Sequence, residues 1–118
     1  MRFSQETRDG VVAFHLSGQL MGGLEAEGLR EAILSAIDRG VREIHIDMGE
    51  VPWVNSAGLG ILIAAHLALR KAGGHLKFFH VSKRIEAILS VTRLNTVFEI
   101  QPGDGPPPGV SASPISGT

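Results

Sequence analysis

The sequence predicts an α/β fold in which a mixed β-sheet of about five strands carries three main helices. Apolar and polar residues alternate in several short segments, which is typical of strands. In longer segments apolar residues recur every three or four positions, which is typical of helices. The segments follow one another as β-β-α-β-α-β-α-β, with glycine-containing breaks between them. A chain of 118 residues is the size of a single domain.

The first two strands are predicted to form a hairpin. Residues 11–17 alternate apolar and polar side chains, and Asp9-Gly10 just before them is a common turn sequence. We therefore expect antiparallel strands at about residues 2–8 and 11–17.

A helix is expected after the Gly22-Gly23 pair. Acidic and basic residues occupy part of this segment, and Gly40 provides a stop. The apolar positions recur at helical spacing and are Leu24, Leu29, Ala32, Ile33, Ala36 and Ile37.

The rest of the domain repeats the pattern of strand and helix. Residues 42–48 have period two, which indicates a central strand leading to a second helix at about residues 57–72. Another strand is expected at residues 75–81, and Ser82 is a good N-cap for a third helix. A short last strand is expected at residues 97–100.

The composition changes after residue 100. The stretch that follows is rich in Pro, Gly and Ser and holds five of the six prolines. We therefore predict a domain at residues 1–100 and a disordered tail at residues 101–118.

Composition also limits the function. The formal net charge of −1 gives no general attraction to phosphate backbones, and an aromatic content of 5% argues against single-stranded nucleic acid. The chain has no cysteine and no segment like a signal peptide or a membrane span. We expect a cytoplasmic protein, a monomer or weak dimer, without membrane insertion, cofactor or metal.

The most informative stretch is Val51 to Leu62, which reads V-P-W-V-N-S-A-G-L-G-I-L. A strand-like segment ends in Asn55-Ser56 and passes directly into the second helix. Free N–H groups and the positive end of the helix dipole favour an anion at such a junction. Ser56 is therefore a helix cap, a nucleophile or a phosphorylation site. Either Asn55 or Ser56 is expected to cap the helix.

The glycines that follow Ser56 suggest that another group approaches the backbone of this helix closely. Gly58 and Gly60 each cost about 1 kcal/mol relative to alanine in a helix, so a kinase active site or a neighbouring strand would explain them. Trp53 fits either the core or a partly exposed contact site. The second helix also has more apolar residues than one face needs.

Enzyme motifs in the chain are incomplete. Gly58 and Gly60 lack the third glycine of a dinucleotide fingerprint, and V-N-S-A-G has only the downstream glycine of the hydrolase motif G-x-S-x-G. The five histidines show no i, i+4 pairing, so their spacing predicts neither a metal site nor a catalytic triad. A small serine hydrolase using Ser56 is the enzyme alternative.

V-N-S-A-G-L-G resembles the Asp-Ser-Ser/Thr-Gly-Leu-Gly switch motif of the STAS domain family, in particular that of the small single-domain anti-sigma factor antagonists of bacteria. The resemblance spans about residues 8–100 and includes L-S-G-Q-L, I-H-I-D-M, A-G-G-H-L and S-V-T-R-L-N-T-V-F-E-I. It implies the STAS fold and a non-enzymatic role in transcription regulation.

The resemblance further implies partner switching. In the family, a protein that is both anti-sigma factor and serine kinase phosphorylates the first hydroxyl residue of the motif, which matches Ser56. The unphosphorylated antagonist would hold the kinase and free a sigma factor, and the phosphorylated form would release the kinase until a phosphatase restores it. The expected partner-binding residues are Gln19, Leu20, Met21, Trp53, Asn55, Ser56, Ala57, Gly58 and Leu59.

The chain departs from the family pattern at three positions around the motif. Asn55 stands where the family usually has Asp, Ala57 replaces the second hydroxyl residue, and Met21 occupies a position where many members carry Asp. These departures keep a second hypothesis open. In it the chain is a constitutive scaffold or complex subunit, in a signalling assembly or in lipid transport, and Ser56 is only a cap.

Overall fold

The computed structural model of the protein describes residues 1–102. They form a five-stranded sheet in the order β1-β2-β3-β4-β5, which confirms the predicted fold class. The strands are β1 (Arg2–Arg8), β2 (Val11–Ser17), β3 (Glu43–Glu50), β4 (His75–Phe79) and β5 (Glu99–Ile100). The helices are α1 (Leu24–Asp38), α2 (Ser56–Lys71) and α3 (Lys83–Val91), with a short 3-10 helix, η1 (Leu94–Thr96).

The sheet is mixed, and its pairing decides where the loops meet. β1 and β2 form the predicted antiparallel hairpin, and the turn between them places Asp9 and Gly10 at positive φ. β2, β3, β4 and β5 are parallel to one another. The carboxyl ends of β2, β3 and β4 therefore lie along one edge of the sheet, which we call the carboxyl edge. The loops that lead into α1 and α2 both start there.

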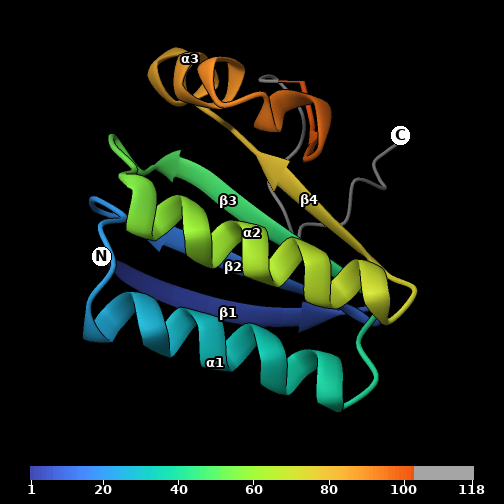
Figure 1. The fold of residues 1–118 in the computed structure, drawn as a ribbon. Coiled ribbons are helices and arrows are strands. Elements are labelled where there is room, and N and C mark those ends of the chain that lie inside the picture. The colour runs from blue at the N-terminus through green and yellow to red at the C-terminus, as the bar shows by residue number, and fades with distance from the viewer. Residues whose placement is uncertain (103–118) are drawn as a thin grey trace, which may run out of the picture.

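Helices α1 and α2 lie side by side on one face of the sheet, whereas α3 stands beyond the carboxyl end of β4 (Figure 1). The strands turn alternate apolar residues towards the helices, as their period of two predicts. Phe14, Ile44, Ile46, Leu76 and Phe78 are buried in this core together with Leu29 and Ile33 of α1 and Leu62 and Leu69 of α2.

The opposite face of the sheet is polar. Residues one position along each strand, such as His15 and Asp47, point away from α1 and α2 and are partly exposed. The chain thus has an aliphatic core on the helix side and a histidine-rich and acidic surface on the other side.

Several predicted boundaries move by one or two residues. β4 ends at Phe79 rather than at residue 81, because His80 adopts a left-handed conformation with φ of 56°. β5 begins at Glu99 rather than at residue 97, because the N–H groups of Val97 and Phe98 donate to the Leu94 carbonyl, at 3.0 and 2.8 Å, in the turn that follows η1. The predicted disordered tail lies, apart from its first two residues, outside the described residues.

Candidate functional site

The loop after β2, residues 18–23, and the loop after β3, residues 51–55, are joined at the carboxyl edge. The backbone N–H of Leu20 donates to the carbonyl of Trp53 at 2.9 Å, and the N–H of Asn55 donates to the carbonyl of Leu20 at 3.2 Å. Gly18 N–H donates to the Glu50 carbonyl at 2.9 Å. These bonds make the two loops a single surface, as the predicted contact residues in both loops require.

Asn55 caps α2, and Ser56 is the first residue of the helix. The Asn55 side-chain oxygen accepts a hydrogen bond from Gly58 N–H at 2.9 Å. The interpretation of Ser56 as the cap is therefore wrong, and the expectation that one of the pair caps the helix is met by Asn55. The Asn55 amide nitrogen also donates to the Met21 carbonyl at 3.3 Å, so this side chain ties the helix to the neighbouring loop.

The cap leaves the Ser56 hydroxyl exposed and without a hydrogen-bond partner among the described residues. Because the first amides of a helix have no partner within it, the N–H groups of Ser56 and Ala57 are also unpaired within residues 1–102. An exposed hydroxyl thus stands beside free donors at the positive end of a 16-residue helix.

The two glycines after Ser56 have different surroundings. A Cβ atom at Gly58 would lie 2.2 Å from the Leu20 carbonyl oxygen, so the loop packs directly on the helix at this point. At Gly60 a Cβ atom would meet nothing within 4 Å. Packing within the chain explains Gly58 and does not explain Gly60.

The predicted partner-binding residues divide into exposed and buried ones. Gln19, Met21, Trp53, Ser56 and Ala57 are exposed and Asn55 is half-buried, but Leu20, Gly58 and Leu59 are buried. Leu20 and Leu59 belong to the core, so their side chains are not available to a partner in this conformation. Spacing alone does not show which way a loop residue points, and a role of Leu20 and Leu59 in partner binding stays a prediction.

Exposed apolar side chains lie in the two joined loops and in the first turn of α1. Trp53 is 39% exposed and Met21 43% exposed, which supports the interpretation of Trp53 as a contact residue. Leu24, which was predicted on the apolar face of the first helix, is 93% exposed. Its position directly after Gly22-Gly23, in the first turn of α1, was the signal that could have separated it from the core positions.

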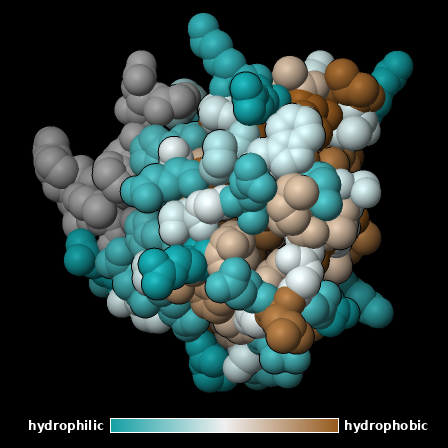
Figure 2. Space-filling view, turned by 90° about the vertical axis from the view of Figure 1, so that its left-hand side faces the viewer, coloured by the Kyte–Doolittle hydropathy of each residue, from teal (hydrophilic) through white to brown (hydrophobic). Residues whose placement is uncertain are grey.

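This exposed surface is neutral. Residues 18–24 and 51–60 contain no Asp, Glu, Lys or Arg. Figure 2 views this end of the molecule, and pale and brown side chains gather on its right-hand half while the left-hand half is mostly teal. We call Met21, Leu24, Trp53, Ser56 and Ala57 the switch surface.

Sequence spacing did not reveal how the histidines are used. Four of them lie at or beside strands and contact carboxylates: His15 contacts Glu6 and Asp47, His45 contacts Glu43, His75 contacts Glu99 and His80 contacts Asp47. The fifth, His66, is buried on α2. None of them hydrogen-bonds Ser56. A serine nucleophile needs a base within hydrogen-bond reach, so the hydrolase alternative has no support from this geometry.

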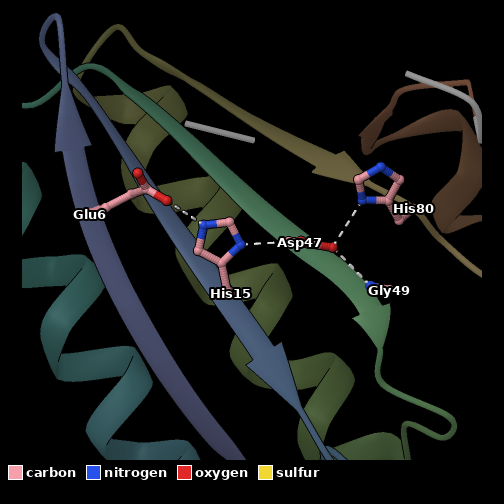
Figure 3. A network of polar contacts seen from close by, with 5 residues as sticks. All are labelled: Glu6, His15, Asp47, Gly49 and His80. Carbon is pink, nitrogen blue, oxygen red and sulfur yellow. Dashed lines mark hydrogen bonds and ion pairs between the residues drawn. The ribbon is translucent and has the colours of Figure 1, made fainter. Parts of the chain in front are cut away.

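The largest polar network lies on the open face of the sheet (Figure 3). It runs from Glu6 through His15 and Asp47 to His80. His15, Asp47 and His80 line a hollow of about 620 Å³ together with Ser4, Ser17 and Glu50. Burial alone would raise the pKa of Asp47. Hydrogen bonds from Gly49 N–H, His80 and His15 outweigh this effect and hold its pKa below the ordinary value.

Two further properties bear on partners and ligands. In the part of the chain that the structure describes, no cluster of three or more His, Asp or Glu residues is arranged to hold a metal ion. None of the helices within residues 1–102 combines the length and the apolar character needed to cross a bilayer.

The chain is similar to known proteins in both sequence and structure. The STAS domain family matches residues 2–103. An anti-sigma-B factor antagonist of Listeria monocytogenes is 32% identical over 96 residues, covering 81% of this chain and 76% of that protein. An anti-sigma-B factor antagonist of Bacillus subtilis is 28% identical over 72 residues, covering 61% and 65%.

Solved structures give the same fold. An anti-sigma factor antagonist from Mycobacterium paratuberculosis superimposes with a TM-score of 0.72 at 26% identity, covering 85% of this chain and 84% of that one. SpoIIAA in its unphosphorylated form gives a TM-score of 0.69 at 20% identity, covering 85% and 87%. With a family match over almost all of the described residues, the chain belongs to the STAS domain family.

Proposed function

We propose that this protein is an anti-sigma factor antagonist that acts by partner switching. In its unphosphorylated form it binds an anti-sigma factor that is also a serine kinase, and phosphorylation of Ser56 releases that partner. The names of its relatives support the first part of this proposal, since those proteins are anti-sigma factor antagonists.

The observation that carries the proposal is the state of Ser56. Its hydroxyl is exposed and takes no part in capping, because Asn55 supplies the cap. A kinase could therefore modify Ser56 without removing a hydrogen bond from the fold. One of the structural relatives, SpoIIAA, has been solved in a phosphorylated form as well.

Charge explains how a phosphate would change binding. Phosphoserine adds about −1.5 to −2 charges and three acceptor oxygens. On the neutral switch surface this charge would have to be desolvated against a partner that fitted apolar side chains such as Met21 and Trp53. Within the domain, the free amides of Ser56 and Ala57 and the helix dipole would offset part of the cost to stability. The modification would thus weaken binding more than folding.

The first experiment is to isolate the protein from its own host, measure its intact mass and map any phosphate by fragmentation. We expect one phosphate on Ser56 that a phosphatase removes. Ser82 is the matched control, because it is an exposed serine at the start of another helix but serves as the α3 cap. No phosphate on Ser56 under several growth conditions would favour a constitutive STAS scaffold.

The second experiment measures the affinity of purified variants for each anti-sigma factor kinase of the host. Ser56→Ala should bind one of them as the wild type does, and Ser56→Asp should bind about tenfold or more weakly, because it places a charge on the neutral surface. Ser90→Asp, which adds the same charge on the exposed side of α3, is the control. Equal binding by Ser56→Asp and wild type would contradict partner switching. Turnover of activated esters that is lost in Ser56→Ala would instead indicate a hydrolase.

A further inference from the structure

His15 lies in the middle of the open face of the sheet, between two carboxylates on neighbouring strands. Its Nε2 is 2.8 Å from Glu6 Oε1 on β1, and its Nδ1 is 3.1 Å from Asp47 Oδ2 on β3. All three side chains are partly buried. One ring therefore joins three adjacent strands (Figure 3).

The geometry specifies the ionisation state of this ring. A neutral imidazole has one N–H donor and one acceptor nitrogen, whereas an imidazolium has two donors. Both nitrogens of His15 face carboxylate oxygens, which accept hydrogen bonds and do not donate them when ionised. The arrangement is complete only when His15 carries both protons. Loss of one proton would leave a nitrogen lone pair against a carboxylate.

We propose that His15 is a proton-operated clasp that holds β1, β2 and β3 together on the open face of the sheet, and that loss of its proton loosens the pairing of these strands. The device does not depend on a partner protein or on phosphorylation of Ser56. It is a property of the sheet that carries the switch surface.

The clasp is connected to the loops of the switch surface through Asp47. The second oxygen of Asp47 accepts from Gly49 N–H at 2.9 Å and contacts His80 Nδ1 at 3.0 Å. Gly49 precedes Glu50, whose carbonyl binds the N–H of Gly18 at the start of the other loop. The two loops thus leave the sheet within a few residues of the clasp.

Several other charged groups share this face of the sheet with His15. Arg2 and Arg8 alternate with Glu6 on the same side of β1, and Glu50 lines the hollow beside the clasp. On β3 and β4, Glu43, His45 and Lys77 form a separate group. His80 approaches His15 only through the shared Asp47 carboxylate. Glu6 and Asp47 are therefore the two groups that contact the ring directly.

The electrostatic environment agrees with the geometry. Partial burial on its own would lower the pKa of His15. Hydrogen bonds and attraction to Asp47 and Glu6 outweigh burial and raise the pKa above its ordinary value. The clasp is therefore closed in acid and opens as the pH rises through this raised pKa.

The test follows the ring nitrogens of His15 by ¹⁵N NMR in the full-length protein between about pH 5 and pH 9, the range in which histidine changes charge. We expect protons on both ring nitrogens at pH 6.5 and a titration midpoint that falls in Asp47→Asn and in Glu6→Gln. A His15 ring that is neutral at pH 6.5, or a midpoint unchanged in both variants, would overturn the proposal.

Amide hydrogen exchange tests whether loss of the His15 proton loosens the strands. After correction for the intrinsic exchange rate, protection of the β1 amides and of the Gly49 amide should fall roughly two- to fivefold as His15 deprotonates. A fall of this size corresponds to the stability that a partly exposed ion pair usually contributes. His15→Gln should lack this step. His75→Gln is the matched control, because His75 lies at the amino end of β4 and pairs with Glu99 of β5 rather than with Glu6 or Asp47. This variant should keep the step. A step that persists in His15→Gln, or one that is absent from the wild type, would refute the clasp.

Discussion

At the scale of single residues, Asn55 decides the chemistry available to Ser56. Its oxygen caps α2 through Gly58 N–H, and its amide nitrogen donates to the Met21 carbonyl. Aspartate could supply the cap but could not donate to a carbonyl. Compared with aspartate, Asn55 therefore adds a hydrogen bond to the neighbouring loop and places no negative charge next to Ser56.

We predict that Asn55→Ala lowers the free energy of unfolding by about 1 kcal/mol, because α2 loses its side-chain cap. Asn55→Asp should keep most of this stability, since aspartate caps helices equally well and its charge suits the helix N-terminus. Urea unfolding of both variants measures the difference. Ser82→Ala, which removes the corresponding cap from α3, provides the comparison. Equal losses in the alanine and aspartate variants would show that the bond to Met21 matters more than the cap.

His66 is a second residue with a consequence for stability. It is buried against Phe98, with ring centroids 5.5 Å apart, and its Nδ1 has no hydrogen-bond partner among the described residues. Burial, and then the positive charge of Arg70, lower the pKa of His66. The folded protein therefore takes up this proton less readily than the unfolded chain does.

The sign of the resulting pH dependence follows from linkage. A histidine whose pKa is lowered by folding gives its full stability above the unfolded pKa of about 6.5, and that stability is lost as the pH falls below it. His15 has the opposite sign. We predict that wild type loses stability relative to His66→Leu between about pH 7.5 and pH 5.5, which urea unfolding at the two pH values would show. A constant difference would mean that His66 is hydrated in the folded state.

Among the elements of the fold, the first turns of α2 contain two glycines with different surroundings. Gly58 lets the loop after β2 lie directly on the helix, whereas Gly60 faces open space. Two glycines of one motif thus have different physical causes. Gly58 is required by the packing of the chain, whereas nothing in the described residues requires a glycine at position 60.

We predict that Gly58→Ala destabilises the protein by more than about 2 kcal/mol, because the new methyl group would collide with the Leu20 backbone. Gly60→Ala should stabilise it by up to about 1 kcal/mol, the difference in helix propensity, and should weaken partner binding. Thermal unfolding measures the effect on stability, and binding to the anti-sigma factor kinase of the proposed function measures the effect on partner binding.

Gly28→Ala is the matched control for Gly60→Ala. Gly28 lies within α1, where an added Cβ would make only an ordinary contact, 3.9 Å from Phe3. This variant should gain stability in the same way and bind normally. Unchanged binding by Gly60→Ala would mean that no partner approaches this turn of α2.

In the molecule as a whole, the described residues divide into a well-packed body and an end, formed by α3 and β5, that makes fewer buried contacts. β1 to β4 share the core with α1 and α2, but β5 pairs with β4 over Glu99 and Ile100 only. Phe98 connects this end to the body through Phe78, at a ring distance of 4.7 Å. Val91, at the end of α3, is exposed.

Hydrogen exchange should show this division. We predict that amides of α3 and β5 are protected at least about tenfold less than those of β2 and β3, because elements with few buried contacts open locally below the global unfolding free energy. Phe98→Ala should lower protection in α3 and β5 first. Uniform protection throughout the domain would show instead that the chain unfolds as one unit.

Sequence patterns predicted most, but not all, of the elements that the structure contains. Periods of two and of three to four residues, together with turn sequences such as Asp9-Gly10, predicted the five strands and three main helices, because most side chains of an element face either the core or water. They failed at β4 and β5, where a left-handed residue and a 3-10 helix shorten the strands. They also placed Leu24 on the apolar face of the first helix, whereas it is exposed at the first position of α1.

Local sequence patterns were sufficient to predict the main strands and helices, the aliphatic core, the α/β class and the serine at the start of α2, because all of these depend on neighbours along the chain. The folded arrangement was needed to show that Asn55 caps the helix and frees Ser56, that Leu20 and Leu59 are buried, and that His15 lies between Glu6 and Asp47. The physical reason is distance in sequence. Glu6 and Asp47 are brought to one ring by strand order and register, which no local pattern specifies.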